Sequence, residues 1–443
     1  MNNLKATVVG AGLAGCEAAM QLANRGVQVT LYEMKPHKMT PAHQSPDFGE
    51  LVCSNSLKAK RIEAAGGLLK AEMRLFDSLC VKTAYECEVP AGGALAVNRH
   101  DFAASMTKAI QNHPNITVIH EEITEIPDGV CVIATGPLTS DAFAKTLQAT
   151  FGGEPLHFFD AAAPIVTAES IDMTCAFAAS RYERGDDDYL NCPMNKEEYE
   201  AFYEQLITAQ RAKLHGIDKD PKVYEGCMPV EIMARRGADT IRFGPLKPVG
   251  LRDPRTGHRP WANLQLRKEN KEGSYYNLVG FQTNLTFPEQ KRVFGMIPAL
   301  KNAEYVRYGV MHRNTFLDSP RLLGEDFSFK QNPDLFFAGQ MTGVEGYMES
   351  AASGILAGVN AYRRLTGQAP LIPPETTMLG ALCRHVSNGE TNDFQPMGAS
   401  FGLLPPLAEH IRDKKERYGA LARRSLETLQ SVLRDENDSL QNN

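Results

Sequence analysis

The chain has no uninterrupted apolar segment of the ~20 residues that a membrane-spanning helix needs. It also has no basic stretch followed by an apolar one near its start, because Met1 to Leu4 lead directly into a strand-like segment. We therefore expect a cytoplasmic protein with no membrane partner. Internal repeats are absent, and the polar tail at 435–443 is the only biased tract, so a repeat architecture is not expected.

The chain also lacks a recognisable cysteine motif and an even distribution of charge. None of the nine cysteines lies in a C-x-x-C motif or a His/Cys cluster with metal spacing, so we expect free thiols and no metal site. The net charge of −6 excludes a uniformly basic nucleic-acid binder. The charge is uneven, however: residues 221–270 contain 10 Lys and Arg against 5 Asp and Glu, and residues 412–434 contain seven basic side chains.

The first 33 residues have the pattern of a nucleotide-binding βαβ unit. An apolar strand precedes a G-x-G-x-x-G motif, an Ala-rich helix follows, and a second apolar strand ends at Glu33. In such a unit the glycines allow a tight turn, a close approach to a pyrophosphate and close helix packing, and the helix N-terminus faces the phosphates. Glu33 has the spacing of the carboxylate that binds the ribose. The motif residues assigned to cofactor binding are Gly10, Ala11, Gly12, Leu13, Ala14 and Gly15.

A similar pattern returns late in the chain. Residues 335–358 read as a strand, a glycine-rich turn and a helix rich in Ala, Ser and Gly, and a buried strand near 129–137 ends in another small-residue turn. Two separated contributions suit FAD, which spans the sheet edge, better than a nicotinamide cofactor. We expect the N-terminus of the late helix to face the flavin pyrimidine edge. The residues assigned to this part of the site are Thr135, Gly136, Gly339, Gln340, Glu345, Gly346 and Tyr347.

The expected fold is α/β. An FAD-binding, Rossmann-like, doubly wound domain is predicted at 1–163 and 306–443, and its second part ends in a basic helix at about 407–434. A smaller α+β domain, with a helix at about 197–214, is predicted as an insertion at 164–305, because the nucleotide-site pattern resumes after it. The basic segment around Trp261 in this insertion is either a phosphate-contacting face for an RNA or solvated charge, and composition leaves both open.

Cys53 has polar neighbours and precedes a segment that we expect to be helical from residues 54–56, with a break at Gly66 and Gly67. A helix N-terminus, together with Lys58 and Lys60, would favour its thiolate form. Local features alone do not distinguish a structural role of Cys53 from a chemical one.

Cys227 lies in an irregular segment between Gly226 and Pro229, beside Glu225 and Glu231. The same two interpretations, structural and chemical, remain open for it. The other seven cysteines are interpreted as ordinary core or surface residues.

Five stretches, from one end of the chain to the other, resemble the bacterial folate- and FAD-dependent tRNA (uracil-5-)-methyltransferases, the TrmFO family. They are Gly10–Ala18, Leu51–Leu57, Glu225–Glu231, Ala338–Tyr347 and Phe394–Met397. The glycine motif is shared by many flavoproteins, whereas the two cysteine motifs and the segment that ends at Tyr347 are more specific.

The resemblance implies reductive methylation of uracil C5 in a T-loop uridine of tRNA. The one-carbon donor would be 5,10-methylenetetrahydrofolate, reduced FAD would be the reductant, and NADH or NADPH would recharge it. A thiolate that adds to uracil C6 makes C5 nucleophilic. The family's reactive pair maps onto Cys53 and Cys227. We favour Cys227 as the nucleophile and Cys53 as an acid/base or protective thiol, and Glu225, Glu231 or the second cysteine could accept the C5 proton.

Three alternatives remain at this stage. The first is an FAD-dependent oxidoreductase that acts on a small molecule. The second is the related FAD- and folate-dependent enzyme that modifies wobble uridines in tRNA, whose extra helical domain 443 residues cannot accommodate. The third is a noncatalytic FAD-binding RNA chaperone. The oligomeric state is left open.

Overall fold

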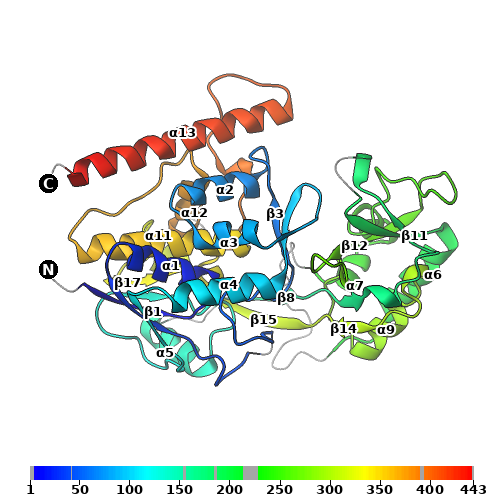
Figure 1. Ribbon diagram of the computed structural model, residues 1–443, viewed down its shortest axis with the longest axis horizontal. Coiled ribbons are helices and arrows are strands. Elements are labelled where there is room, and N and C mark those ends of the chain that lie inside the picture. The colour runs from blue at the N-terminus through cyan, green and yellow to red at the C-terminus, as the bar shows by residue number, and fades with distance from the viewer. Residues whose placement is uncertain are drawn as a thin grey trace.

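The computed structural model describes residues 4–40, 42–152, 156–183, 187–212, 228–389 and 394–441. Within these ranges no helix is both long and apolar enough to cross a membrane. A six-stranded sheet forms the centre of the first part of the molecule (Figure 1), in the order β16-β17-β7-β1-β2-β6. The strands are β1 (Lys5–Val9), β2 (Gln28–Tyr32), β6 (Ile116–Ile119), β7 (Cys131–Ile133), β16 (Ser328–Phe329) and β17 (Asn332–Phe337).

All neighbouring strands of this sheet are parallel except β16, which is antiparallel at one edge. Successive residues of a strand face opposite sides. Accordingly Val8 and Val132 pack in the core beneath α1 (Leu13–Asn24), whereas Val9 and Ile133 pack with α5 (Asp141–Phe151). Helices therefore cover both faces, which confirms the predicted doubly wound α/β fold.

Helix α11 (Tyr347–Leu365) lies directly against α1 (Figure 1). A Cβ built on Gly354 would lie 2.1 Å from the carbonyl oxygen of Ala14, so only glycine allows this approach. The remaining helices of this part are α2 (Ala65–Arg74), α3 (Leu79–Glu86), α4 (Arg99–Gln111), α10 (Ser319–Leu322), α12 (Met378–Ser387) and α13 (Lys414–Gln441). The C-terminal helix, predicted from about residue 407, thus begins at Lys414.

The helix expected after Cys53 was predicted wrongly. Residues Ser56–Ala59 form strand β3, which pairs with β5 (Ala94–Val97), and β4 (Glu88–Val89) completes a small antiparallel sheet. Gly66 and Gly67 do not break a helix but lie in the first turn of α2. Only glycine fits at position 67, because a Cβ on Gly67 would lie 1.8 Å from the carbonyl oxygen of Arg61.

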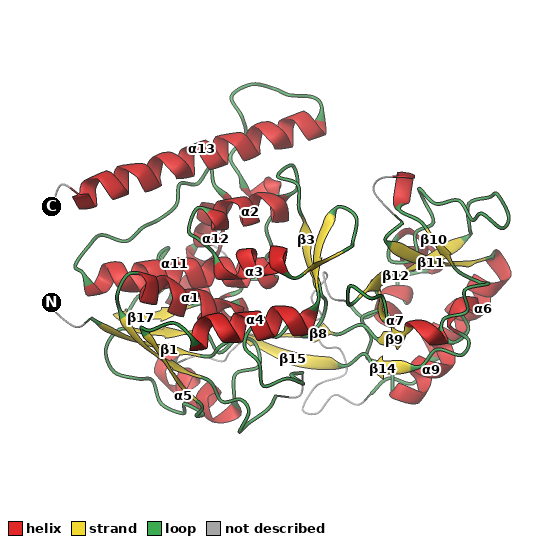
Figure 2. Cartoon of the chain, in the orientation of Figure 1, coloured by secondary structure: helices red, strands yellow, loops and turns green. Residues whose placement is uncertain are grey.

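The chain leaves the first part through β8 (Leu156–Ala161) and returns through β15 (Met311–Phe316), and these two strands pair with each other. Between them lies a second, antiparallel sheet with its own apolar core (Figure 2), in the order β10-β11-β12-β13-β9-β14. Its strands are β9 (Ile165–Thr167), β10 (Phe177–Ala178), β11 (Tyr189–Met194), β12 (Ala262–Lys268), β13 (Tyr275–Leu278) and β14 (Tyr305–Arg307).

The helices of the second part are α6 (Lys196–Thr208), α7 (Val230–Ala234), α8 (Ala238–Phe243) and α9 (Phe287–Phe294). Helix α6 is the helix expected at 197–214, and it ends earlier than predicted. Both described termini lie at the end of the molecule opposite this part (Figure 1). The domain boundaries proposed at 163/164 and 305/306 stay predictions.

Candidate cofactor and catalytic site

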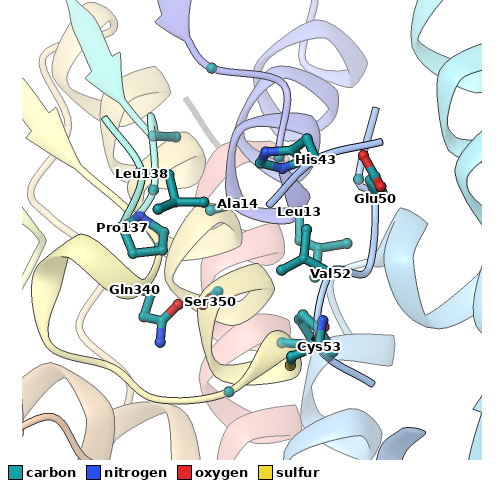
Figure 3. Close-up of a pocket in the computed structure, with 18 of the residues that line it drawn as sticks. Leu13, Ala14, His43, Glu50, Val52, Cys53, Pro137, Leu138, Gln340 and Ser350 are labelled. Atoms are coloured by element: carbon teal, nitrogen blue, oxygen red, sulfur yellow. Dashed lines mark hydrogen bonds between the residues drawn. The ribbon is translucent and has the colours of Figure 1, made fainter. Parts of the chain in front are cut away.

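A cavity of about 350 Å³ runs along the carboxyl ends of the parallel strands, where ligands bind in open α/β sheets. Its wall takes residues from the turns after β1, β2, β7 and β17, and from the loop that contains Cys53. Figure 3 shows Leu138 and Gln340 on one side, with His43, Glu50 and Cys53 on the other. Of the cofactor residues assigned from the sequence, all except Gly15 lie on this wall.

The three positions of the first motif hold glycine for different structural reasons. Gly10 has φ +98°, and a Cβ on it would lie 2.6 Å from the carbonyl oxygen of Ala134. A Cβ on Gly15 would lie 1.8 Å from the carbonyl oxygen of Gly10. Gly12, the N-cap of α1, has φ −73° and no protein atom within 4 Å of an added Cβ. Packing explains the first two positions, whereas the open space at Gly12 fits a pyrophosphate at the helix N-terminus.

Glu33 directly follows β2 and is buried on the cavity wall. Its Oε2 accepts a hydrogen bond from the backbone N–H of Ala11 at 2.7 Å, and its Oε1 accepts one from the N–H of Lys35 at 3.0 Å. The carboxylate therefore lies beside the glycine turn, where the ribose of a dinucleotide would follow the pyrophosphate.

The late glycine-rich turn is braced by the segment Phe394–Met397. A Cβ on Gly343, which has φ +81°, would lie 2.3 Å from the Phe394 ring. The N–H of Met397 donates to the carbonyl of Gly343, and the N–H of Glu345 donates to the carbonyl of Met397, both at 2.9 Å. These contacts hold the turn that leads into the N-terminus of α11 on the cavity wall.

Cys53 is bound to the first residue of α11. The Tyr347 hydroxyl oxygen accepts hydrogen bonds from the N–H groups of Cys53 at 2.8 Å and Ser54 at 3.2 Å, and it lies 2.9 Å from the Cys53 sulfur. Because both of its acceptor positions are filled, the hydroxyl hydrogen is directed to the sulfur. Burial, with the charge of Cys53 next in importance, raises the pKa of Tyr347 well above its usual value. Tyr347 therefore stays protonated and donates to Cys53.

The sources of positive charge near Cys53 differ from those expected. Cys53 lies in a bend before β3 and not at a helix N-terminus. The Nζ of Lys58 pairs with Glu349 at 2.7 Å, and that of Lys60 pairs with Glu88 at 2.6 Å. Both lysines therefore have carboxylate partners of their own.

Two arginines interact electrostatically with Cys53 instead, and sequence reasoning missed both. Arg99 donates to the carbonyl of Leu51 at 2.9 Å and binds both carboxylate oxygens of Glu269. Burial lowers the pKa of Arg307, and its Nε has no hydrogen-bond partner among the described residues. No local motif links either position to Cys53, so the sequence holds no signal for them. Their charges favour the thiolate form of Cys53.

Cys227 and Glu225 lie outside the described residues. Glu231, at 1% exposure, accepts hydrogen bonds from the Thr283 hydroxyl at 2.8 Å and from the N–H of Asn284 at 2.7 Å. Burial raises its pKa. Both of its oxygens are used to fasten α7, so its contacts are those of a structural residue.

The loop that follows β2 supplies further residues to the cavity wall, including His43 and Glu50. The Nδ1 of His43 lies 2.6 Å from the Thr40 hydroxyl. Glu50 accepts hydrogen bonds from the N–H groups of Gln44 at 2.9 Å and Ser45 at 3.2 Å. These residues shape the side of the cavity opposite Gln340 (Figure 3).

One arginine of the basic segment in the insertion is not on the surface. Arg267 is buried at 6% exposure and donates to the Asn55 side-chain oxygen at 2.8 Å and the Ser54 hydroxyl at 2.9 Å. It therefore ties the second sheet to the loop that contains Cys53 and is not part of the phosphate-contacting face considered above. Trp261 is 37% exposed, and the Arg242 guanidinium lies 3.9 Å from its ring centroid.

The fold and the cavity define a dinucleotide-binding α/β protein with a doubly wound sheet. The family model described as "Glucose inhibited division protein A" matches residues 5–369. The chain is similar in fold to Aquifex aeolicus GidA in its form II crystal, with TM-score 0.66, 15% identity and coverage of 100% of this chain and 77% of that one. The form I crystal gives TM-score 0.65 at 16% identity, with coverage of 98% and 79%.

Relatives of much higher identity define the family more narrowly. The chain is 56% identical over 428 residues to "Methylenetetrahydrofolate--tRNA-(uracil-5-)-methyltransferase TrmFO" of Shouchella clausii, covering 97% of this chain and 98% of the relative. It is 55% identical over 435 residues to the protein of the same name from Lactiplantibacillus plantarum, covering 98% of each. The chain therefore belongs to the TrmFO family, which confirms the resemblance seen in its motifs, and FAD is the cofactor of this family.

Proposed function

We propose that this protein methylates C5 of a T-loop uridine in tRNA. In this reaction 5,10-methylenetetrahydrofolate supplies the one-carbon unit, and NADH or NADPH supplies the electrons. The observation that carries the proposal is the position of Cys53, whose sulfur is hydrogen-bonded to Tyr347 on the same cavity wall as Gly12 and Glu33. A dinucleotide site needs no thiol, whereas C5 methylation of uracil does.

We assign the cavity wall to FAD, with its parts in order along the wall. The amino end of α1 and the open space at Gly12 would receive the pyrophosphate, and Glu33 would bind the ribose. The turn from Gly339 to Gly346 and the amino end of α11 would face the flavin. When bound, FAD supplies the reducing equivalents that convert a methylene group into a methyl group.

The two cysteines would act on the base. In our proposal the Cys227 thiolate forms a bond with uracil C6, and the displaced electron pair makes C5 nucleophilic toward the methylene carbon. As the bond between C5 and this carbon forms, a bond from the carbon to a folate nitrogen breaks, and its electron pair stays on the nitrogen. Removal of the C5 proton then lets the C6–S bond break and restores the ring. Val230 donates its N–H to Gln282 on the cavity wall at 2.7 Å. Val230 is the third residue after Cys227 in the sequence.

Cys53 is our candidate for the base that accepts the C5 proton at its sulfur. The Tyr347 hydroxyl and the charges of Arg99 and Arg307 stabilise its thiolate form. We prefer Cys53 to Glu231 because both oxygens of Glu231 already accept hydrogen bonds away from the cavity wall.

Purified protein incubated with a tRNA transcript, methylenetetrahydrofolate and NAD(P)H should produce 5-methyluridine, detected after digestion. Cys53→Ala and Cys227→Ala should each abolish the product and keep the flavin absorbance. Cys175→Ala is a matched control, since Cys175 is also partly exposed but is not on the cavity wall. No product with the native protein would refute the methyltransferase function, and full activity in both variants would refute the assigned thiols. Redox turnover of a small molecule by the double variant would favour the oxidoreductase alternative.

A further inference from the structure

Lys58 has a strained backbone on the cavity wall. Its φ is +64°, although it lies within strand β3, and a positive φ is uncommon for residues other than glycine. This conformation costs about 1 to 2 kcal/mol in an L-residue. Glycine or asparagine would adopt it at lower cost. The position nevertheless holds a lysine, and such outliers cluster at functional sites.

Three glycines from separate parts of the chain make room for the Lys58 side chain. A Cβ on Gly66 would lie 3.1 Å from the Cβ of Lys58, so the aliphatic part of the side chain runs along the start of α2. A Cβ on Gly346 would lie 2.9 Å from the Lys58 Nζ, and one on Gly398 would lie 3.3 Å from it. The ammonium group is therefore enclosed between two glycines at the amino end of α11.

Lys58 has one carboxylate partner. Its Nζ donates to Oε1 of Glu349 at 2.7 Å, and this carboxylate is fully buried in the first turn of α11. Oε1 also accepts a hydrogen bond from the N–H of Ala399 at 2.9 Å. Oε2 has no hydrogen-bond partner in the described part of the chain. The Lys58 side chain as a whole is half exposed.

The charge of this cluster is not balanced. The buried ammonium of Lys70 donates to the carbonyls of Leu57 at 2.6 Å and Gly66 at 2.7 Å, and it interacts with the same Glu349. Burial lowers the pKa of Lys70 to about 8, so it is still mainly charged at neutral pH. Among the described residues, two ammonium groups and the positive end of α11 thus interact with the carboxylate of Glu349. A cation at a helix N-terminus is unfavourable unless an anion is also present, so this end of the cavity suits an anionic group.

We propose that Lys58 is a cofactor-contacting residue whose ammonium faces the pyrimidine half of the flavin and stabilises its anionic reduced form. The proposal rests on the assigned FAD site. Because Gly12 and Glu33 would hold the pyrophosphate and ribose, the flavin belongs at the other end of the cavity, which Gly346 and Lys58 line. Two electrons and one proton convert the neutral oxidised flavin into an anion. A nearby ammonium favours that anion.

The test compares the midpoint potential of bound FAD in the wild type and in Lys58→Met, with dithionite as the electron source and a reference dye. We expect Lys58→Met to weaken binding of reduced FAD relative to oxidised FAD at least about tenfold, which lowers the two-electron potential by about 30 mV. Lys60→Met is the matched control, because Lys60 pairs with Glu88 and does not line the cavity. Lys58→Arg should retain most of the wild-type potential.

Two further variants keep the test decisive if Lys58→Met folds poorly. Lys58→Asn tolerates the positive φ, removes the positive charge, and should lower the potential in the same way. Glu349→Gln removes the opposing charge and should raise the potential. Unchanged potentials in Lys58→Asn and Glu349→Gln would overturn the role of Lys58. If the wild type binds FAD and methylates tRNA in that case, the proposed function stands without it, whereas wild-type protein that does not hold FAD would refute the function itself.

Discussion

The hydroxyl oxygen of Tyr347 lies 2.9 Å from the sulfur of Cys53, and it also accepts the N–H of Cys53. Tyr347 is therefore the first residue of α11 and also binds the loop that contains Cys53. The arrangement sets the distance between the amino end of that helix and the sulfur, although the two residues are far apart in the sequence.

Tyr347→Phe should reduce the reactivity of Cys53. The variant loses the hydrogen bond that favours the thiolate, and a hydrogen bond to a charged group contributes about 1.5 to 3 kcal/mol. We therefore expect alkylation of Cys53 by iodoacetamide at neutral pH to slow by at least about tenfold, with the pH profile moved upward. Peptide mass spectrometry identifies the modified residue, and Cys53→Ser provides the background. An unchanged pH profile would show that the hydroxyl does not act on the sulfur.

Gly12→Ala and Gly15→Ala should separate ligand binding from folding. The Cβ at Gly12 meets no protein atom within 4 Å, so the free energy of unfolding of the FAD-free protein should change by less than about 0.5 kcal/mol. FAD affinity should fall at least about tenfold, because the methyl group fills the space for the pyrophosphate. Gly15→Ala brings its Cβ to 1.8 Å from a carbonyl oxygen and should destabilise the fold by more than about 3 kcal/mol. Urea denaturation and flavin fluorescence titration measure the two effects, and wild-type FAD affinity in Gly12→Ala would contradict the assigned pyrophosphate site.

Glu72 should make stability depend on pH. It is fully buried on α2, accepts the N–H groups of Met378 and Leu379 at 2.8 Å each, and accepts the hydroxyl of Ser425 from α13. Burial raises its pKa to about 7 from an ordinary value near 4.5. The folded state therefore holds a proton that the unfolded state releases. The resulting stability is complete below pH of about 4.5 and is lost as the pH rises through about 7.

The measurement is urea denaturation of wild type and Glu72→Gln over this pH range. The free energy of unfolding of the wild type, relative to the variant, should fall by up to about 3 kcal/mol between the two limits. Glu375→Gln, at an exposed carboxylate, is the control for the change in charge and should follow the wild type. Parallel curves for Glu72→Gln and the wild type would contradict the raised pKa.

Asn55→Ala should weaken the junction between the small antiparallel sheet and the second six-stranded sheet, because Asn55 binds residues of β5 and β12. The Asn55 side chain accepts from Arg267 at 2.8 Å and donates to the carbonyls of Val97 at 3.1 Å and Lys268 at 3.0 Å. Its removal leaves a buried guanidinium group without one of its acceptors, at a cost of about 2 to 4 kcal/mol. Chemical denaturation measures this cost, and Asn302→Ala, at an exposed position, should stay within about 0.5 kcal/mol of the wild type. A loss no larger than that of the control would exclude Asn55 as a link between the sheets.

Much of the fold follows from local sequence signals. Parallel strands are buried on both faces, so they appear as short apolar runs, and the glycine motif marks the turn from β1 into α1. These signals report backbone geometry over a few residues. For that reason they predicted the doubly wound sheet, the glycine turns and the side of the sheet on which the cavity lies. The motif around Cys53 also indicated the family, although its local structure was predicted wrongly.

The error at Ser56–Ala59 shows the limit of local patterns. Polar residues that could cap a helix precede an apolar residue there, yet pairing with β5 makes the segment a strand. That pairing partner lies about forty residues further along the chain. Tertiary context therefore decided a conformation that the local pattern left ambiguous.

By itself, the sequence determined the nucleotide-binding unit, the FAD cofactor and the two thiols to test, because each depends on residue types at short, regular spacing. Only the tertiary structure decided what surrounds Cys53, namely the Tyr347 hydroxyl and the charges of Arg99 and Arg307. It also decided that Arg267 is buried against the loop that contains Cys53. It also decided that Lys58 lies among glycines from three parts of the chain. Hydrogen bonds and electrostatic interactions depend on distance in space. Tertiary packing sets these distances between residues that are far apart in the sequence, so no spacing in the sequence predicts them.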